Sequence, residues 1–261
     1  MSGLFYVFLK WTKAADNNAS AKHGRYLLTF SSRYEADELF RDLKDLQSGN
    51  RHLFPVLIRT SAQFWCYDSP ESWESILRFQ MRNDLPQFKN TFMTQLLPNG
   101  DGNSTWPIIQ NPELGPDWIS GGEYFIRNRR QPNLYWYVWA NQIRTSVSRR
   151  TKFCITRTGT FSDADRAPVV LVRLDKVSVR AVAETLTPGA INPDNRKYVS
   201  VSERPTNHLE MSAKDTHWEF GTLVNKVVGV MWDTCSDATW ESEVPLVTYM
   251  PGGGGDEWEL V

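Results

Sequence analysis

Apolar positions in the first 97 residues recur with two periods, one typical of strands and one typical of helices. Runs rich in aromatic and β-branched residues, bounded by polar or turn-forming residues, predict five strands. These runs cover residues 4–11, 25–30, 52–59, 62–67 and 91–97.

Two helices are predicted between these strands. Ser32 and Glu35 have the spacing of a capping box, and the residues that follow place an apolar face at helical spacing: Ala36, Leu39, Phe40, Leu43 and Leu46. Ser69-Pro70-Glu71 is typical of a second helix start, because serine caps the helix and proline tolerates the first turn. The order of elements predicts an α+β domain over residues 1–97. A ferredoxin-like sandwich is favoured, with another α+β arrangement as the alternative.

The pattern changes after residue 97. Residues 98–118 contain four prolines and three glycines, which predicts a linker and a domain boundary. Residues 119–261 show short apolar runs separated by turn residues and no amphipathic helix, which predicts an all-β barrel or sandwich. The predicted strands are 123–129, 134–139, 152–157, 169–174, 177–182, 198–202, 209–212, 218–220, 227–232, 245–249 and 257–261.

Two segments carry a resemblance to a known family. The run Gly122-Glu123-Tyr124-Phe125-Ile126-Arg127-Asn128 resembles the opening strand of a fungal ricin-B-like β-trefoil, and residues 252–260 resemble its closing strand. The resemblance implies a lectin-like β-trefoil over residues 119–261. Its first and last strands would pair, with Tyr124 and Ile126 next to Trp258 and Leu260. The combination with residues 25–30 and 62–65 upstream is similar to uncharacterised intracellular fungal proteins.

The family's sugar-binding residues have no matching positions here. The lectin family repeats Gln-x-Trp, whereas this chain has Asp256 two positions before Trp258 and no equally spaced copies. The resemblance therefore implies a fold and a class of function without assigning binding residues.

Charge is unevenly distributed in this second region. The whole chain has 29 Lys and Arg against 30 Asp and Glu, a net charge of −1. Residues 127–180 contain twelve basic and three acidic residues, a balance of +9, whereas residues 181–261 contain five and thirteen, a balance of −8. Either the two segments neutralise each other in the fold, or the molecule presents a basic face to a partner.

The basic segment supplies one candidate site. Arg129, Arg130, Arg149 and Arg150 are predicted to form a basic surface for an anionic partner, with Arg149 and Arg150 in a hairpin loop. The segment also contains Tyr135, Trp136, Tyr137 and Trp139, and basic residues interleaved with aromatic ones are typical of single-stranded nucleic acid sites.

A carbohydrate site needs an exposed aromatic ring next to short polar side chains. The chain offers two such groups: Trp139 with Asn141, and Trp232 with Asp233, Asp237 and Trp240. Each tryptophan taken alone is also typical of a barrel core.

Signs of catalysis, metals and cofactors are lacking. The four histidines match no zinc spacing and the three cysteines form no C-x-x-C pair. The chain has no Gly-x-Ser-x-Gly motif and no phosphate-binding loop before a helix. We therefore predict no catalytic residue, no metal and no cofactor. No secretory signal and no apolar run long enough for a bilayer are visible, so a cytoplasmic protein without a membrane partner is expected.

These patterns lead to three functional hypotheses. The first is a non-catalytic, lectin-like protein that binds a glycan or glycoprotein through loops of the trefoil. The alternative is a protein-interaction, inhibitor or assembly protein that uses the arginine-rich surface, with a protein partner or a second copy of the chain. The further alternative, binding of single-stranded nucleic acid, is the least favoured of the three.

Overall fold

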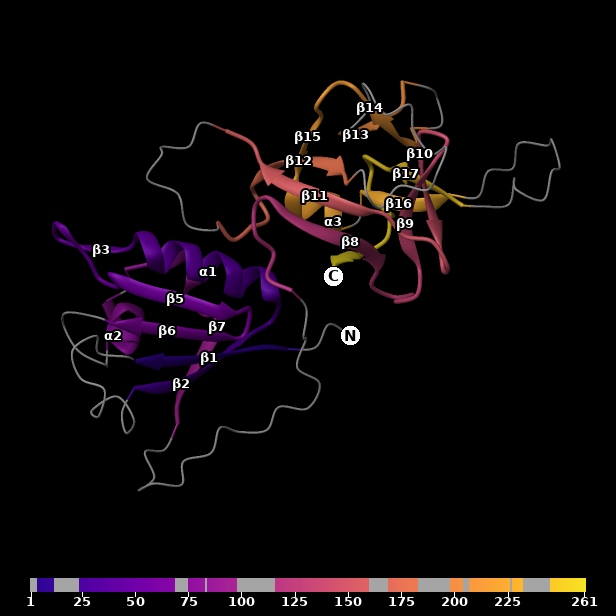
Figure 1. Ribbon diagram of the computed structural model, residues 1–261. Coiled ribbons are helices and arrows are strands. Elements are labelled where there is room, and N and C mark those ends of the chain that lie inside the picture. The colour runs from indigo at the N-terminus through magenta and orange to yellow at the C-terminus, as the bar shows by residue number, and fades with distance from the viewer. Residues whose placement is uncertain are drawn as a thin grey trace. The chain divides into compact units, whose positions relative to one another are not determined.

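A computed structural model describes residues 4–11, 24–68, 75–82, 84–97, 116–159, 169–182, 198–203, 207–225, 227–231 and 245–261. The chain divides into two compact units, Met1–Asp117 and Trp118–Val261 (Figure 1). Strands account for 49% and helices for 16% of the described residues, so the protein is mostly β. No helix in the described ranges has the length and apolar character needed to cross a membrane.

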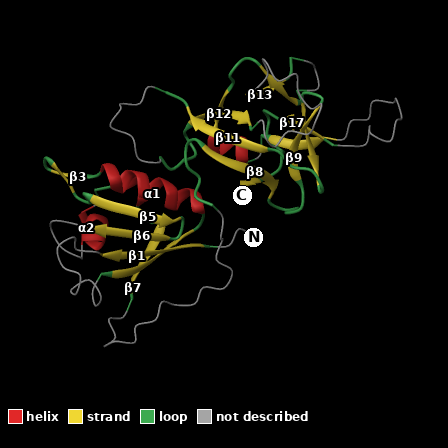
Figure 2. Ribbon diagram, in the orientation of Figure 1, coloured by secondary structure: helices red, strands yellow, loops and turns green. Residues whose placement is uncertain are grey.

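The first unit is a five-stranded sheet with two main helices (Figure 2). The strand order is β5-β6-β1-β2-β7, in which β1 and β6 are parallel and the other neighbours are antiparallel. The strands are β1 (Phe5–Trp11), β2 (Arg25–Phe30), β5 (Val56–Ser61), β6 (Phe64–Asp68) and β7 (Phe92–Leu96). The remaining elements are α1 (Arg33–Asp45), α2 (Ser75–Arg82), the short hairpin β3 (Gln47–Ser48) and β4 (Arg51–His52), and the 3₁₀ turn η2 (Pro86–Phe88).

Helix α1 forms as its sequence predicts. The capping box at Ser32 is present, and Oε2 of Glu35 accepts a hydrogen bond from the Ser32 amide at 3.2 Å. Four residues of the predicted apolar face are buried, namely Ala36, Leu39, Phe40 and Leu43, whereas Leu46 follows the end of the helix and is half-buried. The Phe40 ring packs edge-on against Trp65 with centroids 5.1 Å apart. The residues Ser69-Pro70-Glu71, predicted to start the second helix, lie outside the described residues, and α2 is described from Ser75.

The predicted ferredoxin-like sandwich is wrong. That fold follows the order β-α-β-β-α-β. In this unit β1 and β2 pair in antiparallel fashion before α1. Strand β1 then pairs in parallel with β6, whose antiparallel partner is β5. Periodicity identified the elements, but the order of strands depends on contacts between residues far apart in the sequence.

The second unit contains a closed antiparallel barrel of seven strands, in the order β8-β9-β10-β14-β13-β12-β11 and back to β8. The pair between Gln142 in β10 and Glu210 in β14 closes the ring. Its strands are β8 (Gly122–Asn128), β9 (Tyr135–Trp139), β10 (Gln142–Ser146), β11 (Lys152–Arg157), β12 (Lys176–Ala181), β13 (Tyr198–Val201) and β14 (Leu209–Ser212).

Four further strands extend the barrel wall. Strand β15 (His217–Glu219) pairs with β12, and β18 (Trp258–Leu260) pairs with β8. Strand β17 (Leu246–Tyr249) pairs with β10, and β16 (Val228–Met231) pairs with β17. One short helix, α3 (Phe220–Val224), follows β15.

The β-trefoil implied by the resemblance is also wrong, because the ring has seven strands and is not built from three equal repeats. Strand β10 was not predicted. The predicted strand at 169–174 is absent from the named strands and keeps only a bridge between Val170 and Ile119. The pairing of the first and last strands is nevertheless confirmed, since Leu260 lies opposite Ile126 in the ladder of β18 and β8.

The core of the second unit is filled by large side chains. Trp136 is fully buried and packs edge-on against Phe153 and Trp258, with centroids 6.0 and 5.3 Å away. Tyr124, Ile126 and Asn128 of β8 are buried at alternate positions, as a strand with one face toward a core requires. The other face of β8 is therefore the one available for a surface site.

Candidate functional site

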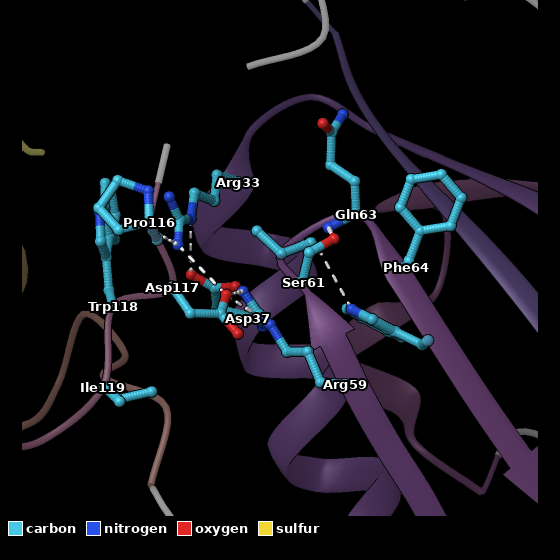
Figure 3. Close-up of polar contacts among 12 residues, drawn as sticks. Arg33, Asp37, Arg59, Ser61, Gln63, Phe64, Pro116, Asp117, Trp118 and Ile119 are labelled. Carbon is cyan, nitrogen blue, oxygen red and sulfur yellow. Dashed lines mark hydrogen bonds and ion pairs between the residues drawn. The ribbon is translucent and has the colours of Figure 1, made fainter. Parts of the chain in front are cut away.

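Four charged side chains meet in the first unit (Figure 3). Arg59 of β5 lies 2.6 Å from Asp37 of α1 and 2.6 Å from Asp117, and Arg33 lies 3.4 and 3.6 Å from the same carboxylates. Arg33 also donates a hydrogen bond to the carbonyl oxygen of Pro116 at 2.8 Å. The cluster fastens residues 116–117 to α1 and β5.

This cluster has the character of a structural ion-pair network. Two guanidinium groups balance two carboxylates, and the Arg59, Asp37 and Arg33 side chains are only 3%, 1% and 7% exposed. Burial raises the pKa of the Asp37 carboxyl, while the charges of Arg59 and Arg33 oppose that rise. Because its charges satisfy one another, the cluster presents no free group to a ligand.

Residues suited to metal binding or catalysis do not gather in the described part of the chain. No group of three or more His, Cys, Asp and Glu side chains there could hold a metal ion. The Ser178 hydroxyl donates to Asp215 at 2.7 Å, and His217 lies 3.7 Å from the other oxygen of that carboxylate. An activated serine needs the imidazole next to its hydroxyl, and here the carboxylate takes that place.

The second unit carries a surface on which arginines cover aromatic rings. Arg149 lies over Trp139 and Tyr137, with 5.1 and 6.0 Å from its guanidinium carbon to the ring centroids. Arg150 lies over Phe125 and Tyr135 at 4.4 and 5.8 Å. We call these six residues the arginine–aromatic surface: Phe125, Tyr135, Tyr137, Trp139, Arg149 and Arg150.

Strand geometry explains how the rings come together. Tyr135, Tyr137 and Trp139 occupy alternate positions of β9, so their side chains share one face of the strand. Phe125 comes from β8, and its ring lies edge-on to Tyr135 with centroids 6.4 Å apart. The sequence showed both the aromatic residues and their spacing, but not that two arginines would cover them.

The arginines reach the rings because residues 147–151 cross from β10 to β11, past β9 and β8. The backbone amide of Thr151 donates to the carbonyl of Trp136 at 3.0 Å, and its hydroxyl accepts from the amide of Val138 at 3.1 Å. The prediction that Arg149 and Arg150 lie in a hairpin loop is therefore wrong, since β10 and β11 are not neighbours in the sheet. Their connection is anchored to the backbone of β9 by the two hydrogen bonds of Thr151.

Part of the basic segment is neutralised inside the second unit. Such neutralisation was one of the two alternatives that the charge pattern left open. Arg127 lies 2.6 Å from Glu259, and Arg129 lies 4.0 Å from Glu257. Although partial burial opposes it, the hydrogen bond and charge of Glu259 raise the pKa of Arg127. Lys176 pairs with Glu219 at 3.3 Å. Arg129, one of the four predicted surface arginines, thus has a carboxylate partner.

The other three predicted arginines differ from Arg129. Within the part of the chain that the structure describes, Arg130, Arg149 and Arg150 have no carboxylate within 4.0 Å, and all three side chains are exposed. Arg144 of β10 likewise contacts no described carboxylate and donates to Oε1 of Gln142 at 2.8 and 3.2 Å. The surface is therefore rich in positive charge that its described surroundings leave unbalanced.

Asn128 shapes the loop that carries Arg130. Its side-chain oxygen accepts hydrogen bonds from the backbone amides of Arg130 and Gln131, both at 2.9 Å, and the residue is 3% exposed. We expect Asn128→Ala to lower the free energy of unfolding by about 1–3 kcal/mol, because two amides lose their acceptor. Urea denaturation measures this loss. Asn128→Asp retains an acceptor and serves as the control, and equal losses in both variants would contradict this role.

The predicted carbohydrate residues are only partly described. Trp139 is half-buried and one side of its ring is covered by Arg149. Asn141 lies in the tight turn between β9 and β10 with a φ of 65°, and its buried Oδ1 has no hydrogen-bond partner among the described residues. Trp232, Asp233, Asp237 and Trp240 lie outside the described residues. The structure thus brings Trp139 together with Arg149 and leaves the second carbohydrate group undescribed.

The arginine–aromatic surface is the strongest candidate site in the described parts of the chain, because it combines exposure, unbalanced charge and side chains held in place. Comparison of the chain with protein-family models, with curated proteins and with solved structures found no match.

Proposed function

We propose that the chain is a non-catalytic binding protein that docks an acidic protein partner on its arginine–aromatic surface. The observation that carries this proposal is the pair Arg149 and Arg150, whose exposed guanidinium groups lie over aromatic rings and contact no described carboxylate. It corresponds to the protein-interaction alternative predicted from the sequence.

Contact with the rings prepares these side chains for binding. A guanidinium group over an aromatic ring keeps the N–H donors in its plane available, and a carboxylate accepts two of them side by side. Because the rings already restrict the arginine side chains, binding costs less side-chain entropy than it would for free arginines. The surface is therefore suited to carboxylates.

The same geometry favours an acidic protein over single-stranded nucleic acid as the partner of this surface. Sequence-independent nucleic acid sites stack bases on open aromatic faces. Here the guanidinium groups occupy faces of the rings, and Tyr137 is only 3% exposed. A nucleic acid would have to displace the arginines to stack, or bind through phosphates alone.

Three expectations from the sequence stay predictions. Lectin-like glycan binding has Trp139 and Asn141 in its favour, but the trefoil that suggested it is not the fold of this unit. A cytoplasmic location and a homo-oligomeric state also stay predictions. None of them has an observation as specific as the two arginines over aromatic rings.

Charge reversal tests the proposal. We expect Arg149→Glu with Arg150→Glu to abolish binding of a fluorescein-labelled decaglutamate peptide, with a loss of about tenfold or more for each arginine. Fluorescence anisotropy at near-physiological salt measures the affinity. Arg180→Glu with Lys214→Glu is the matched control, because both residues are exposed in the same unit and the change in net charge is equal. Equal losses in the two double variants would contradict the proposal.

A charge-preserving variant distinguishes binding through the paired N–H donors of arginine from attraction by net positive charge alone. Arg149→Lys with Arg150→Lys keeps both positive charges but removes the paired N–H donors. We expect this variant to bind decaglutamate about tenfold more weakly than the wild-type protein. Unchanged affinity would mean that net charge alone attracts the peptide.

A further inference from the structure

We infer that the edge of β7 that faces away from β2 pairs with the same strand of a second copy of the chain. The pairing joins the sheets of two first units into one continuous sheet. This inference goes beyond the proposed function, because it concerns the other unit of the chain and a different partner.

Strand β7 is the last strand of its sheet, and β2 is its one neighbour among the described strands. The amide of Leu97 donates to the carbonyl of Arg25 at 2.9 Å, and alternate residues of an antiparallel strand direct their backbone groups to opposite sides. The N–H and C=O groups of Phe92, Thr94 and Leu96 therefore point away from β2. No described residue forms a backbone hydrogen bond with them there.

The opposite edge of the sheet carries the protection that β7 lacks. In β5 the ladder to β6 shifts its register between Arg59 and Ser61, and the Arg59 side chain is held in the buried ion-pair network. A bulge and an inward-pointing charge are two devices by which natural proteins prevent an edge strand from pairing with another chain. Strand β7 contains no charged residue and no proline, and its ladder to β2 is continuous. Of the two edges, that of β7 is therefore open to strand addition.

A second β7 is complementary to this edge when the two strands run antiparallel about a two-fold axis at Thr94. In that register Thr94 lies opposite Thr94 of the second copy, and Phe92 lies opposite Leu96 of the second copy at both ends. Each of these three pairs exchanges two hydrogen bonds, so the pairing forms about six. A register shifted by two residues loses one of the three pairs.

The side chains of β7 also suit a second copy. Met93 is 67% exposed and would lie opposite the exposed Gln95 of the second copy, while Leu96, which is 42% exposed, would gain Phe92 as a neighbour. Because β7 carries no charge, no like charges meet in this pairing. On the arginine–aromatic surface, in contrast, a second copy would bring arginines against arginines. The uncharged edge is therefore suited to a second copy, and the basic surface to an acidic partner.

Two variants of the edge test the dimer. Thr94→Pro removes the N–H at the axis, and an edge strand tolerates proline where the amide faces away from the sheet. Leu96→Lys places a charge at each end of the paired strands. Leu174→Lys is the matched control, because Leu174 is an exposed leucine of the second unit.

Sedimentation equilibrium measures the association. We expect the wild-type protein to form dimers in the micromolar range. Because each substitution changes the interface twice, once in each copy, the dissociation constant should rise about tenfold or more in Thr94→Pro and in Leu96→Lys. It should stay unchanged in Leu174→Lys.

Hydrogen exchange followed by NMR locates the interface within the strand. The amides of Thr94 and Leu96 have no described acceptor in the single chain, so their protection should increase with protein concentration. The amides of Met93 and Gln95 face β2 and should stay protected at every concentration.

Three results would overturn the inference: a chain that stays monomeric throughout the micromolar range, a dimer that persists in Thr94→Pro and in Leu96→Lys, or a dimer in which the amides of β7 gain no protection. The edge variants leave Arg149 and Arg150 unchanged. Their affinity for decaglutamate should therefore equal that of the wild-type protein, so the proposed function is tested separately.

Discussion

Replacing Arg59 with methionine is expected to lower the free energy of unfolding of the first unit by about 3–5 kcal/mol. The side chain is 3% exposed, and each of its terminal nitrogens lies 2.6 Å from a carboxylate. Its removal takes the 2.6 Å ion pair away from Asp37 and leaves the longer contact to Arg33 at 3.4 Å. A buried negative charge is then uncompensated, which is the costly result of breaking such a pair.

The loss in Arg59→Met is expected to depend on pH. Burial raises the pKa of Asp37, and Arg59 opposes that rise, so the pKa climbs further in the variant. A folded state that holds this proton more tightly than the unfolded chain loses stability as pH rises above about 4, where an ordinary carboxyl ionises. The difference between wild-type protein and variant should therefore grow from pH 4 to pH 7.

Hydrogen exchange read by mass spectrometry measures this effect for each unit separately. Amides in α1 and β5 should lose protection in Arg59→Met, while those in β8 and β11 keep it. Arg59→Met combined with Asp37→Leu removes one charge of each sign and should recover much of the loss. Arg51→Met, at an exposed position of β4, should change little. Equal protection in Arg59→Met and Arg51→Met would show that the network contributes nothing to stability.

Replacing Trp258 with alanine is expected to lower the free energy of unfolding of the second unit by about 3–5 kcal/mol. Trp258 is 2% exposed and packs against Trp136 with centroids 5.3 Å apart. Its indole N–H donates to the carbonyl of Val228 at 2.7 Å. Alanine leaves a cavity beside Trp136 and removes the link between β18 and β16.

Two matched variants divide this loss into its parts. Trp258→Phe keeps a ring but removes one of the two hydrogen bonds to the Val228 carbonyl, which still accepts from the Asp256 amide at 3.0 Å. A smaller loss of about 0.5–1.5 kcal/mol is therefore expected. Val147→Ala changes a side chain that is 73% exposed and should have almost no effect. Urea denaturation measures the free energy of unfolding of each variant. Hydrogen-exchange protection of amides in β8 and β16 shows whether the loss is local to these strands. A loss below 1 kcal/mol in Trp258→Ala would mean that β18 is not needed to hold the barrel together.

Local elements followed from the sequence because their signals lie within one turn or a few residues. The capping box at Ser32 and the spacing of Leu39 and Leu43 identified α1 without any distant contact. The alternation in β8 likewise separated buried Tyr124 and Ile126 from outward Arg127. These features depend only on the geometry of a helix or a strand.

Two errors in strand assignment in the second unit arose where a local pattern did not reveal its partner. Strand β10 is predominantly polar, with Ile143 and Thr145 as its buried residues, so it lacked a strong apolar run. The run at 169–174 is apolar, but the carboxylate of Asp175 accepts from the Val172 amide at 2.8 Å within a turn, and Leu174 is 78% exposed. A strand also needs a partner edge, which the sequence of the run does not show.

The sequence by itself determined the helix and strand segments it correctly identified and the separation of charge into a basic and an acidic segment. Only the tertiary structure decided which charges cancel. Arg127 is neutralised because β18 brings Glu259 to it across 132 residues, whereas Arg149 and Arg150 land on aromatic rings, away from every described carboxylate. Electrostatic interaction depends on distance in space, and strand pairing between remote residues sets that distance.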